Sequence, residues 1–183
     1  VLFRSTGASK GMGKAIAKKF AADKNNLFLC ARTETALQET RNEIIALYPE
    51  TKVNVFAADL TMKNQVKAFA DFCLQSGTPD ILINNAGTYK PGTCIDQSYE
   101  EFENLMNINF YSAFHLTRMF VPAMIKNRHG HIFNICSIAS LKAYRDGGGY
   151  GVSKFALNGF SQNLRLELMP HNRSEEHTSE LQS

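Results

Sequence analysis

The sequence lacks paired cysteines, a basic run and any long apolar stretch. Its four cysteines, Cys30, Cys73, Cys94 and Cys136, are scattered and form no CxxC pair, so we expect buried thiols and no metal or redox site. The net charge of +3 comes without a basic stripe, which excludes nucleic acid as an expected partner. No stretch reaches the ~20 apolar residues of a membrane span, and no secretory signal opens the chain. We therefore expect a cytoplasmic protein that does not bind membranes.

The two ends of the chain differ in character from the rest. There is no initiating Met, and the tail from Arg173 onward is polar without an apolar period. One short DNA sequence can encode Arg173–His177, and its reverse complement can encode Val1–Ser5. This DNA sequence resembles an adapter used in short-read sequencing libraries. The alternative is that the polar tail and the start of the first strand both belong to the natural protein. We expect residues 1–5 and 173–183 to be non-native, which leaves a single domain over 6–172.

Within this domain, short apolar runs alternate with longer helical patterns. Such alternation is typical of βαβ units and predicts an α/β fold with a doubly wound parallel sheet. The length of 183 residues and 44% hydrophobic content suit one globular domain. Strands are predicted over 27–31, 52–57, 81–83 and 131–136, and helices over 11–22, 33–47, 64–74, 100–126 (broken near 107–109) and 150–168, with a flexible loop over 139–149.

A glycine-rich turn precedes the first predicted helix. Residues 6–13 read TGASKGMG and fit the pattern TGxxxGxG. Glycine permits the required bend and the close approach of a pyrophosphate, and the helix N-terminus offers free N–H groups. An ordinary tight turn is the alternative. The candidate cofactor-binding residues here are Gly7, Ser9, Lys10, Gly11, Met12 and Gly13.

Two cations suggest which dinucleotide binds. Lys10 lies inside the turn, and Arg32 follows an apolar strand directly, where an acidic residue would bind the ribose hydroxyl of NAD. A 2′-phosphate needs cations, so the pair favours NADP(H) over NAD, unless both are simply solvated surface charges. Asp59, with Leu60 beside it, could accept a hydrogen bond from the adenine amino group, or Asp59 could cap the next helix.

Tyr150 and Lys154 form a YxxxK pattern on the last predicted helix. The spacing i, i+4 places both side chains on one face. A tyrosine hydroxyl ordinarily has a pKa of about 10, and a nearby ammonium group favours the phenolate. The pair therefore suggests a tyrosine that exchanges protons near neutrality, although such a pair also occurs on helices by chance.

The combination of motifs resembles the classical short-chain dehydrogenase/reductase family. The chain shows TGxxxGxG over 6–13, NNAG over 84–87, Asn109, Ser137 and YxxxK over 150–154, in the family's order. Ser137 precedes Tyr150 by thirteen residues, the usual interval. The resemblance covers essentially all of residues 6–172.

The resemblance implies a role for each motif. Tyr150 would be the general acid in carbonyl reduction, and Lys154 would lower its pKa and hold the nicotinamide ribose. Ser137 would hydrogen-bond the substrate oxygen. Asn109 would distort its helix and hold a water molecule that links Lys154 to solvent. The residues implied to line the ribose side of the cofactor are Asn85, Ala86 and Gly87, together with Tyr150 and Lys154.

The chain also departs from the family pattern. The resemblance implies a Rossmann-like sheet of strand order 3-2-1-4-5-6-7, and here the first strand and the last two are expected to be missing or only mimicked. The substrate loop that follows would be missing as well, so the fragment itself is expected to fold poorly and to be inactive. For the full-length protein the resemblance implies a homodimer or homotetramer.

These observations predict an NADP(H)-dependent oxidoreductase that reduces a small-molecule carbonyl to an alcohol. The candidate substrates are a 3-oxoacyl thioester, a ketone or a sepiapterin-like carbonyl. One alternative is an NADP-dependent alcohol or polyol dehydrogenase acting in the oxidative direction, since the same residues serve both directions. Another is a non-catalytic NADP-binding module.

Overall fold

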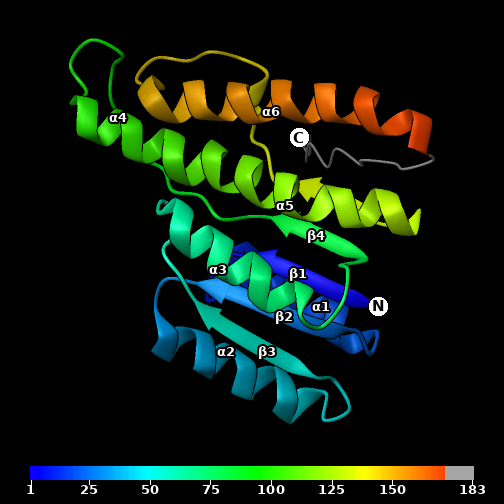
Figure 1. Cartoon of the computed structure of the whole chain (residues 1–183). Coiled ribbons are helices and arrows are strands. Elements are labelled where there is room, and N and C mark those ends of the chain that lie inside the picture. Colours follow the sequence, from blue (N-terminus) through cyan, green and yellow to red (C-terminus); the bar gives the residue numbers. More distant parts are fainter. Residues whose placement is uncertain (172–183) are drawn as a thin grey trace.

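A computed structural model of the chain describes residues 1–171 and shows a parallel sheet with helices on both faces (Figure 1). The strand order is β3-β2-β1-β4-β5. The strands are β1 (Leu2–Thr6), β2 (Asn26–Ala31), β3 (Val53–Ala57), β4 (Ile81–Asn84) and β5 (His131–Asn134). The helices are α1 (Gly11–Ala22), α2 (Glu34–Leu47), α3 (Lys63–Leu74), α4 (Tyr99–Met106), α5 (Ser112–Asn127) and α6 (Gly148–Leu168). The expected non-native segment 173–183 lies outside the described residues, as does residue 172.

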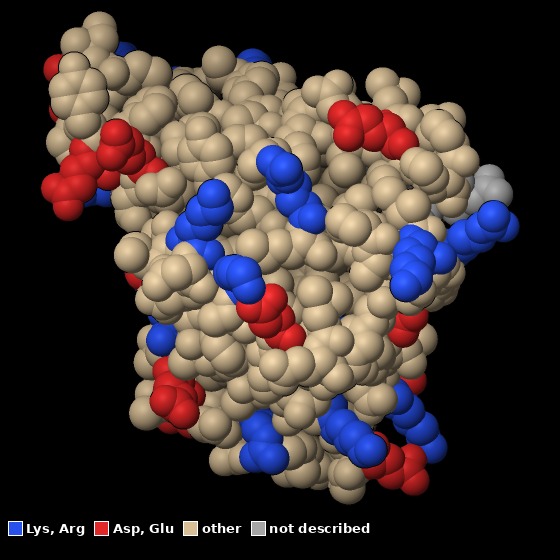
Figure 2. Space-filling view, in the orientation of Figure 1, with Lys and Arg blue, Asp and Glu red and all other residues tan. Residues whose placement is uncertain are grey.

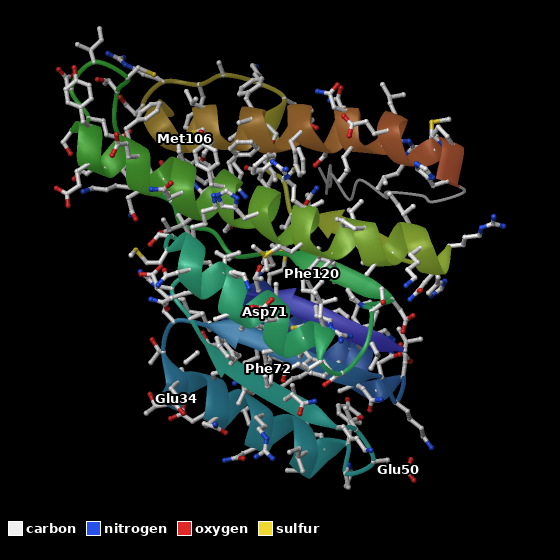
Figure 3. The ribbon with its side chains drawn as sticks, in the orientation of Figure 1. Glu34, Glu50, Asp71, Phe72, Met106 and Phe120 are labelled. Carbon is white, nitrogen blue, oxygen red and sulfur yellow. The ribbon has the colours of Figure 1, made fainter. Side chains whose placement is uncertain are left out.

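Alternate residues of each strand serve opposite faces of the sheet, because side chains in a strand point alternately up and down. Phe28 and Leu82 pack in a core cluster with α3, α5 and α6. Leu27 and Ile83, each one position away, pack in a second cluster with α1 and α2. Figure 3 labels Phe120 of α5, a member of the first cluster, and Phe72 of α3, which packs against that cluster. Phe114 of α5 and Phe160 of α6 lie with ring centroids 5.6 Å apart, where Figure 1 shows the two helices side by side.

The central strand β1 is formed by residues that the sequence led us to set aside. Leu2–Thr6 pairs in parallel with β2 on one side and with β4 on the other. The first strand is thus present in the structure, which fits the expectation that it would be mimicked rather than the expectation that it would be missing. Phe3 is fully buried and its ring stacks on Phe20 of α1, with centroids 4.2 Å apart. Arg4 is also fully buried, an unusual residue for the middle of a parallel sheet.

On its α1 side, the sheet is covered unevenly. Helices α1 and α2 cover the β1–β2–β3 part of this face. Next to α1 lies an open apolar groove of about 390 Å³, which contains Ile83 of β4 and Phe133 of β5. Strand β5 is the last strand on this side among the described residues. Parallel sheets are normally covered on both faces, so this groove agrees with the expected incompleteness of the sheet.

Two expected irregularities have a defined structure. The helix predicted over 100–126 is continuous but takes a π-helical turn over Asn107–Tyr111, which separates α4 from α5. The prediction of a flexible loop over 139–149 is wrong in part. A short 3-10 helix spans Ile138–Ser140, and Gly147, Gly148 and Gly149 are buried, with α6 beginning at Gly148.

Candidate active site

The glycine-rich turn joins β1 to α1, as the motif predicts. Gly7 and Gly11 have positive φ angles of 63° and 53°, which L side chains rarely adopt. A Cβ at Gly11 would have no atom of the described residues within 4 Å, so the backbone there faces open space. A Cβ at Gly13 would lie 2.2 Å from the carbonyl oxygen of Gly7. Gly13 is thus required for packing, whereas Gly11 leaves the turn open to a ligand.

A groove of about 440 Å³ opens above the carboxyl ends of β1, β2 and β4. We call it the dinucleotide groove. The predicted residues that line it are Gly7, Ser9, Lys10, Gly11, Met12, Arg32, Leu60, Asn85, Ala86 and Gly87. Lining residues that the sequence did not single out include Thr33, Ala36, Thr61, Thr88, Asn104 and Ile108. No motif marks these six residues, because they come from helices α2 and α4, the π-helical turn and the loops around them, which only the fold brings to the groove.

The charge of the dinucleotide groove is positive. Lys10 and Arg32 are its charged lining residues and both are exposed, with no carboxylate among the residues that line it. No side chain caps the N-terminus of α1 in the described residues, and helix N-termini attract anions. These features suit a ligand that carries phosphate groups. Elsewhere, Lys and Arg are interspersed with Asp and Glu on the face shown in Figure 2.

Asp59 is engaged with its own turn. Its Oδ1 accepts hydrogen bonds from the N–H and hydroxyl groups of Thr61, at 2.9 and 2.8 Å. Its own N–H donates to Gln65 Oε1 at 2.7 Å. Asp59 is not among the residues that line the groove. Of the two alternatives for this residue, these contacts match a local role in the turn that leads into α3.

Thr6 joins the turn to the NNAG segment, a link that the sequence analysis missed. Its hydroxyl oxygen accepts hydrogen bonds from the N–H groups of Asn85 and Ala86, at 3.0 and 2.9 Å. Asn85 Nδ2 donates in return to the carbonyl oxygen of Thr6, at 3.0 Å. The first residue of the TGxxxGxG motif thus holds the two halves of the groove together.

Asn109 lies in the middle of the π-helical turn and is almost fully buried, at 1% exposure. Its Oδ1 accepts from the N–H of Thr88 at 2.8 Å, and its Nδ2 donates to the carbonyl oxygen of Thr88 and to Ser153 Oγ, both at 3.0 Å. The expected distortion of the helix at Asn109 is therefore present. The water molecule implied at this position stays a prediction.

Lys154 lies next to Ser153 on α6 and is also buried. Its Nζ donates to the carbonyl oxygen of Ile135 at 2.8 Å. Burial lowers the pKa of Lys154, and nearby Cys136 partly opposes this shift. A Cβ at Gly87 would lie 3.0 Å from Asn109 Oδ1 and 3.7 Å from Lys154 Nζ. Asn109, Lys154 and the wall of the dinucleotide groove thus meet at Gly87.

Tyr150 begins the same face of α6, one turn before Lys154. Its ring packs edge-to-face against Tyr89, with centroids 4.9 Å apart and an interplanar angle of 88°. Burial raises the pKa of Tyr144, and the proximity of Tyr89 and Tyr150 adds to this shift. Tyr89 and Tyr144 are 57% and 42% exposed. Three tyrosines therefore cluster at the mouth of the site.

Ser137 caps the N-terminus of the 3-10 helix. Its Oγ accepts from the N–H of Ala139 at 3.2 Å, and its own N–H donates to Ser140 Oγ at 3.0 Å. Ser137 lines the apolar groove next to α1 rather than the dinucleotide groove, and Met12 lines both. Asn109, Lys154 and Tyr150 are not among the residues that line the dinucleotide groove. The structure brings Asn109 and Lys154 next to Gly87, which does line it, and places Ser137 in the apolar groove.

Residues 1–171 contain no cluster of His, Cys, Asp and Glu suited to hold a metal ion. In the same part of the chain, every helix is too short or too polar to cross a membrane.

Comparison with known proteins identifies the family. The model of the short chain dehydrogenase family matches residues 5–173. The chain is 34% identical to sepiapterin reductase of Chlorobaculum tepidum, over 88% of its own length and 68% of that protein. This chain belongs to the short-chain dehydrogenase family.

Other relatives carry varied names. The chain is 34% identical to dehydrogenase/reductase SDR family member 7B of Xenopus tropicalis and 31% identical to 3-oxoacyl-(acyl-carrier-protein) reductase of Buchnera aphidicola. The match to the Xenopus protein covers 91% of this chain and 55% of that protein, and the match to the Buchnera protein covers 90% of this chain and 66% of that protein. The chain thus spans between half and two thirds of their length.

Solved structures show the same fold. A metagenomic short-chain oxidoreductase in complex with NADP is similar with a TM-score of 0.91 and 33% identity, over 96% of this chain and 80% of that one. The L-sorbose reductase of Gluconobacter frateurii, in complex with NADPH and L-sorbose, is similar with a TM-score of 0.87 and 30% identity, over 94% of this chain and 65% of that one.

Proposed function

We propose that the full-length protein to which this chain belongs binds NADP(H) in the dinucleotide groove and reduces a carbonyl group to an alcohol. The observation that carries this proposal is the position of Gly87. Gly87 lines the groove, and its Cα is also where Asn109 and Lys154 converge. Groups suited to hold a dinucleotide and groups suited to move a proton therefore occupy one continuous site.

The residues of the groove fit a dinucleotide phosphate. The open backbone at Gly11 and the uncapped start of α1 suit a pyrophosphate. Lys10 and Arg32 suit the additional phosphate of NADP(H). The similar structures in complex with NADP and NADPH support this choice. When bound, the nicotinamide ring supplies the hydride.

The protein's own part of the reaction is to place and protonate the substrate. Tyr150 donates its hydroxyl proton to the carbonyl oxygen, and Ser137 donates a hydrogen bond to the same oxygen as negative charge develops there. The Lys154 ammonium group stabilises the phenolate that Tyr150 becomes. Asn109 holds Lys154 in place through Ser153.

The names of the relatives support several substrate classes. A 3-oxoacyl thioester and a sepiapterin-like carbonyl follow from the reductases of those names, and a ketone is the general case. The L-sorbose reductase favours a sugar or polyol substrate, which also suits an NADP-dependent dehydrogenase acting in the oxidative direction. A non-catalytic NADP-binding module is the remaining alternative.

We also propose that the full-length protein is a cytoplasmic homodimer or homotetramer. The support for self-association is the exposure of large apolar side chains on the π-helical turn and α6. Tyr111 of the turn and Val152 and Phe155 of α6 each expose between 41% and 43% of their surface. Exposed apolar patches of this kind are typical of protein interfaces.

The test is consumption of NADPH by the purified full-length protein with a panel of carbonyls: a 3-oxoacyl thioester, a simple ketone and sepiapterin. We expect Tyr150→Phe to lower kcat at least ~100-fold, because it removes the proton donor. Tyr99→Phe, at a tyrosine of α4 that is 92% exposed, is the matched control and is expected to act like the wild type.

The outcomes separate the alternatives. Faster turnover of alcohols with NADP⁺ than of carbonyls with NADPH would favour the dehydrogenase. Tight NADPH binding without turnover of any carbonyl or alcohol would favour the non-catalytic module. Equal turnover by the wild type and Tyr150→Phe would contradict the role of Tyr150.

A further inference from the structure

Gln97 connects the loop before α4 to the beginning of α6. Its Oε1 accepts a hydrogen bond from the backbone N–H of Gly149 at 2.8 Å, across 52 positions of sequence. Gly149 directly precedes Tyr150. The bond therefore reaches the backbone beside the proposed proton donor.

Helix α6 has no capping side chain of its own. The residue before the helix is Gly147, which has no side chain, and no side-chain hydrogen bond caps this end. The first N–H groups of any helix lack acceptors within that helix. Gln97, from a loop distant in sequence, supplies an acceptor to one of these N–H groups, in the turn of α6 that carries Tyr150.

The glycine run at the start of α6 allows this loop to come close. A Cβ at Gly149 would lie 2.9 Å from Gln97 Oε1, and a Cβ at Gly148 would lie 2.5 Å from the carbonyl oxygen of Gly92. The N–H of Gly92 donates to the carbonyl oxygen of Asp146 at 3.1 Å. The run of three glycines is therefore a packed junction between two loops.

The same loop touches the ring of Tyr150. Tyr89, near its start, makes the edge-to-face contact with Tyr150 described above. Residues 88–98 thus hold Tyr150 at two points, by its ring through Tyr89 and by its backbone turn through Gln97.

We propose that Gln97 is a positioning residue for Tyr150, which it serves by capping the first turn of α6. The consequence for turnover rests on the proposed function, whereas the cap itself does not. Only the acceptor oxygen of Gln97 is used, since its Nε2 is buried without a hydrogen-bond partner among the described residues. Glutamate would keep an acceptor at this position and would also favour the positive end of the helix.

The test compares Gln97→Met, which keeps the length of the side chain without an acceptor, with Gln97→Glu. In Gln97→Met we expect the Gly149 amide to exchange hydrogen about tenfold faster, the gain expected when one hydrogen bond is lost. We also expect kcat to fall with no change in the Kd of NADPH. Gln97→Glu is expected to restore both values.

NMR spectroscopy follows the ring of Tyr150 directly and does not depend on turnover. In NMR spectra of chain with ¹³C-labelled tyrosine, the Tyr150 signal is the one absent from Tyr150→Phe. We expect this signal to shift or broaden in Gln97→Met and to return in Gln97→Glu, while buried amides of β2 keep their protection in both variants.

If the Gly149 amide exchanged hydrogen in Gln97→Met at the wild-type rate, the proposal that Gln97 caps α6 would be overturned. Faster exchange with an unmoved Tyr150 signal would overturn the positioning role. A full-length wild type without turnover would contradict the proposed function, and the Tyr150 signal would still decide whether Gln97 positions that ring.

Discussion

Asn109 donates a hydrogen bond from Nδ2 to Ser153 Oγ at 3.0 Å, and this bond ties the π-helical turn to α6 inside the protein. Ser153 Oγ in turn donates to the carbonyl oxygen of Tyr150 at 2.7 Å. A fully buried serine thus links two of the proposed catalytic residues and directly precedes the third, Lys154.

Ser153→Ala is expected to lower the free energy of unfolding by about 1–2 kcal/mol, because it removes both hydrogen bonds and leaves a buried amide proton without an acceptor. Urea unfolding measures this change. Ser161→Ala is the matched control, since Ser161 is also buried on α6 and accepts from Asn134 Nδ2 at 2.7 Å, away from Lys154. Both variants should lose stability, but only Ser153→Ala should lower kcat. An equal effect of the two on kcat would contradict the link.

Lys154→Met is expected to stabilise the fold while abolishing turnover. The Lys154 ammonium group is buried, and the acceptor that it meets is the neutral carbonyl oxygen of Ile135 rather than a carboxylate. Removing a buried charge is expected to raise the free energy of unfolding by about 2 kcal/mol at neutral pH. An unchanged or lower stability would show that the ammonium group is better satisfied than this contact indicates.

The pH dependence of that gain has a definite sign. Burial lowers the pKa of Lys154 in the folded chain, whereas the unfolded chain keeps the ordinary lysine value of about 10.4. Between these two values the unfolded chain binds more protons, so the stability of the wild type rises with pH there. The advantage of Lys154→Met should therefore shrink as the pH rises through this window. Unfolding at several alkaline pH values, with Lys67→Met as an exposed control, measures it.

Arg4→Met with Ser5→Val is expected to stabilise the chain by about 2 kcal/mol. Arg4 Nη2 donates to the carbonyl oxygens of Cys73 and Gly77, both at 3.0 Å, and the guanidinium group lies 4.2 Å from the centroid of the Phe28 ring. Among the described residues, however, Arg4 Nε and Nη1 and Ser5 Oγ have no hydrogen-bond partner. Such residues are poorly suited to a central strand. Thermal unfolding of the double variant tests this prediction, and destabilisation would contradict it.

Gly11 and Gly159 should respond to alanine in opposite directions. At neither position would an added Cβ have an atom of the described residues within 4 Å, so space does not distinguish them. Gly11 has a φ of 53°, so alanine there is strained and should cost about 1 kcal/mol. Gly159 lies inside α6, where alanine should stabilise by about 1 kcal/mol. Gly11→Ala should also weaken NADPH binding, which fluorescence titration measures, and equal affinity would contradict a phosphate site at this turn.

The fold could be predicted largely from local patterns. The apolar runs around Leu27 and Ile83 and the helical periods between them indicated a parallel sheet, and the glycine-rich turn indicated the end of the sheet at which the groove opens. Strand β1 was not predicted, because residues 1–5 were set aside as non-native. In the structure, pairing with the strands on both sides decides their place. The contacts that join the site, such as Gln97 to Gly149 and Thr6 to Asn85, link distant positions that share no motif.

The most direct test of the proposed cofactor site is the affinity of the chain for NADPH against NADH, measured by fluorescence titration. Arg32→Asp is the variant, and Lys67→Asp, at an exposed lysine that does not line the groove, is the control. We predict that the wild type binds NADPH at least tenfold more tightly, a difference of about 1.4 kcal/mol. Arg32→Asp should remove this preference, and the control should keep it. Equal affinities, or a preference for NADH in the wild type, would contradict the assignment of Lys10 and Arg32 to a phosphate group.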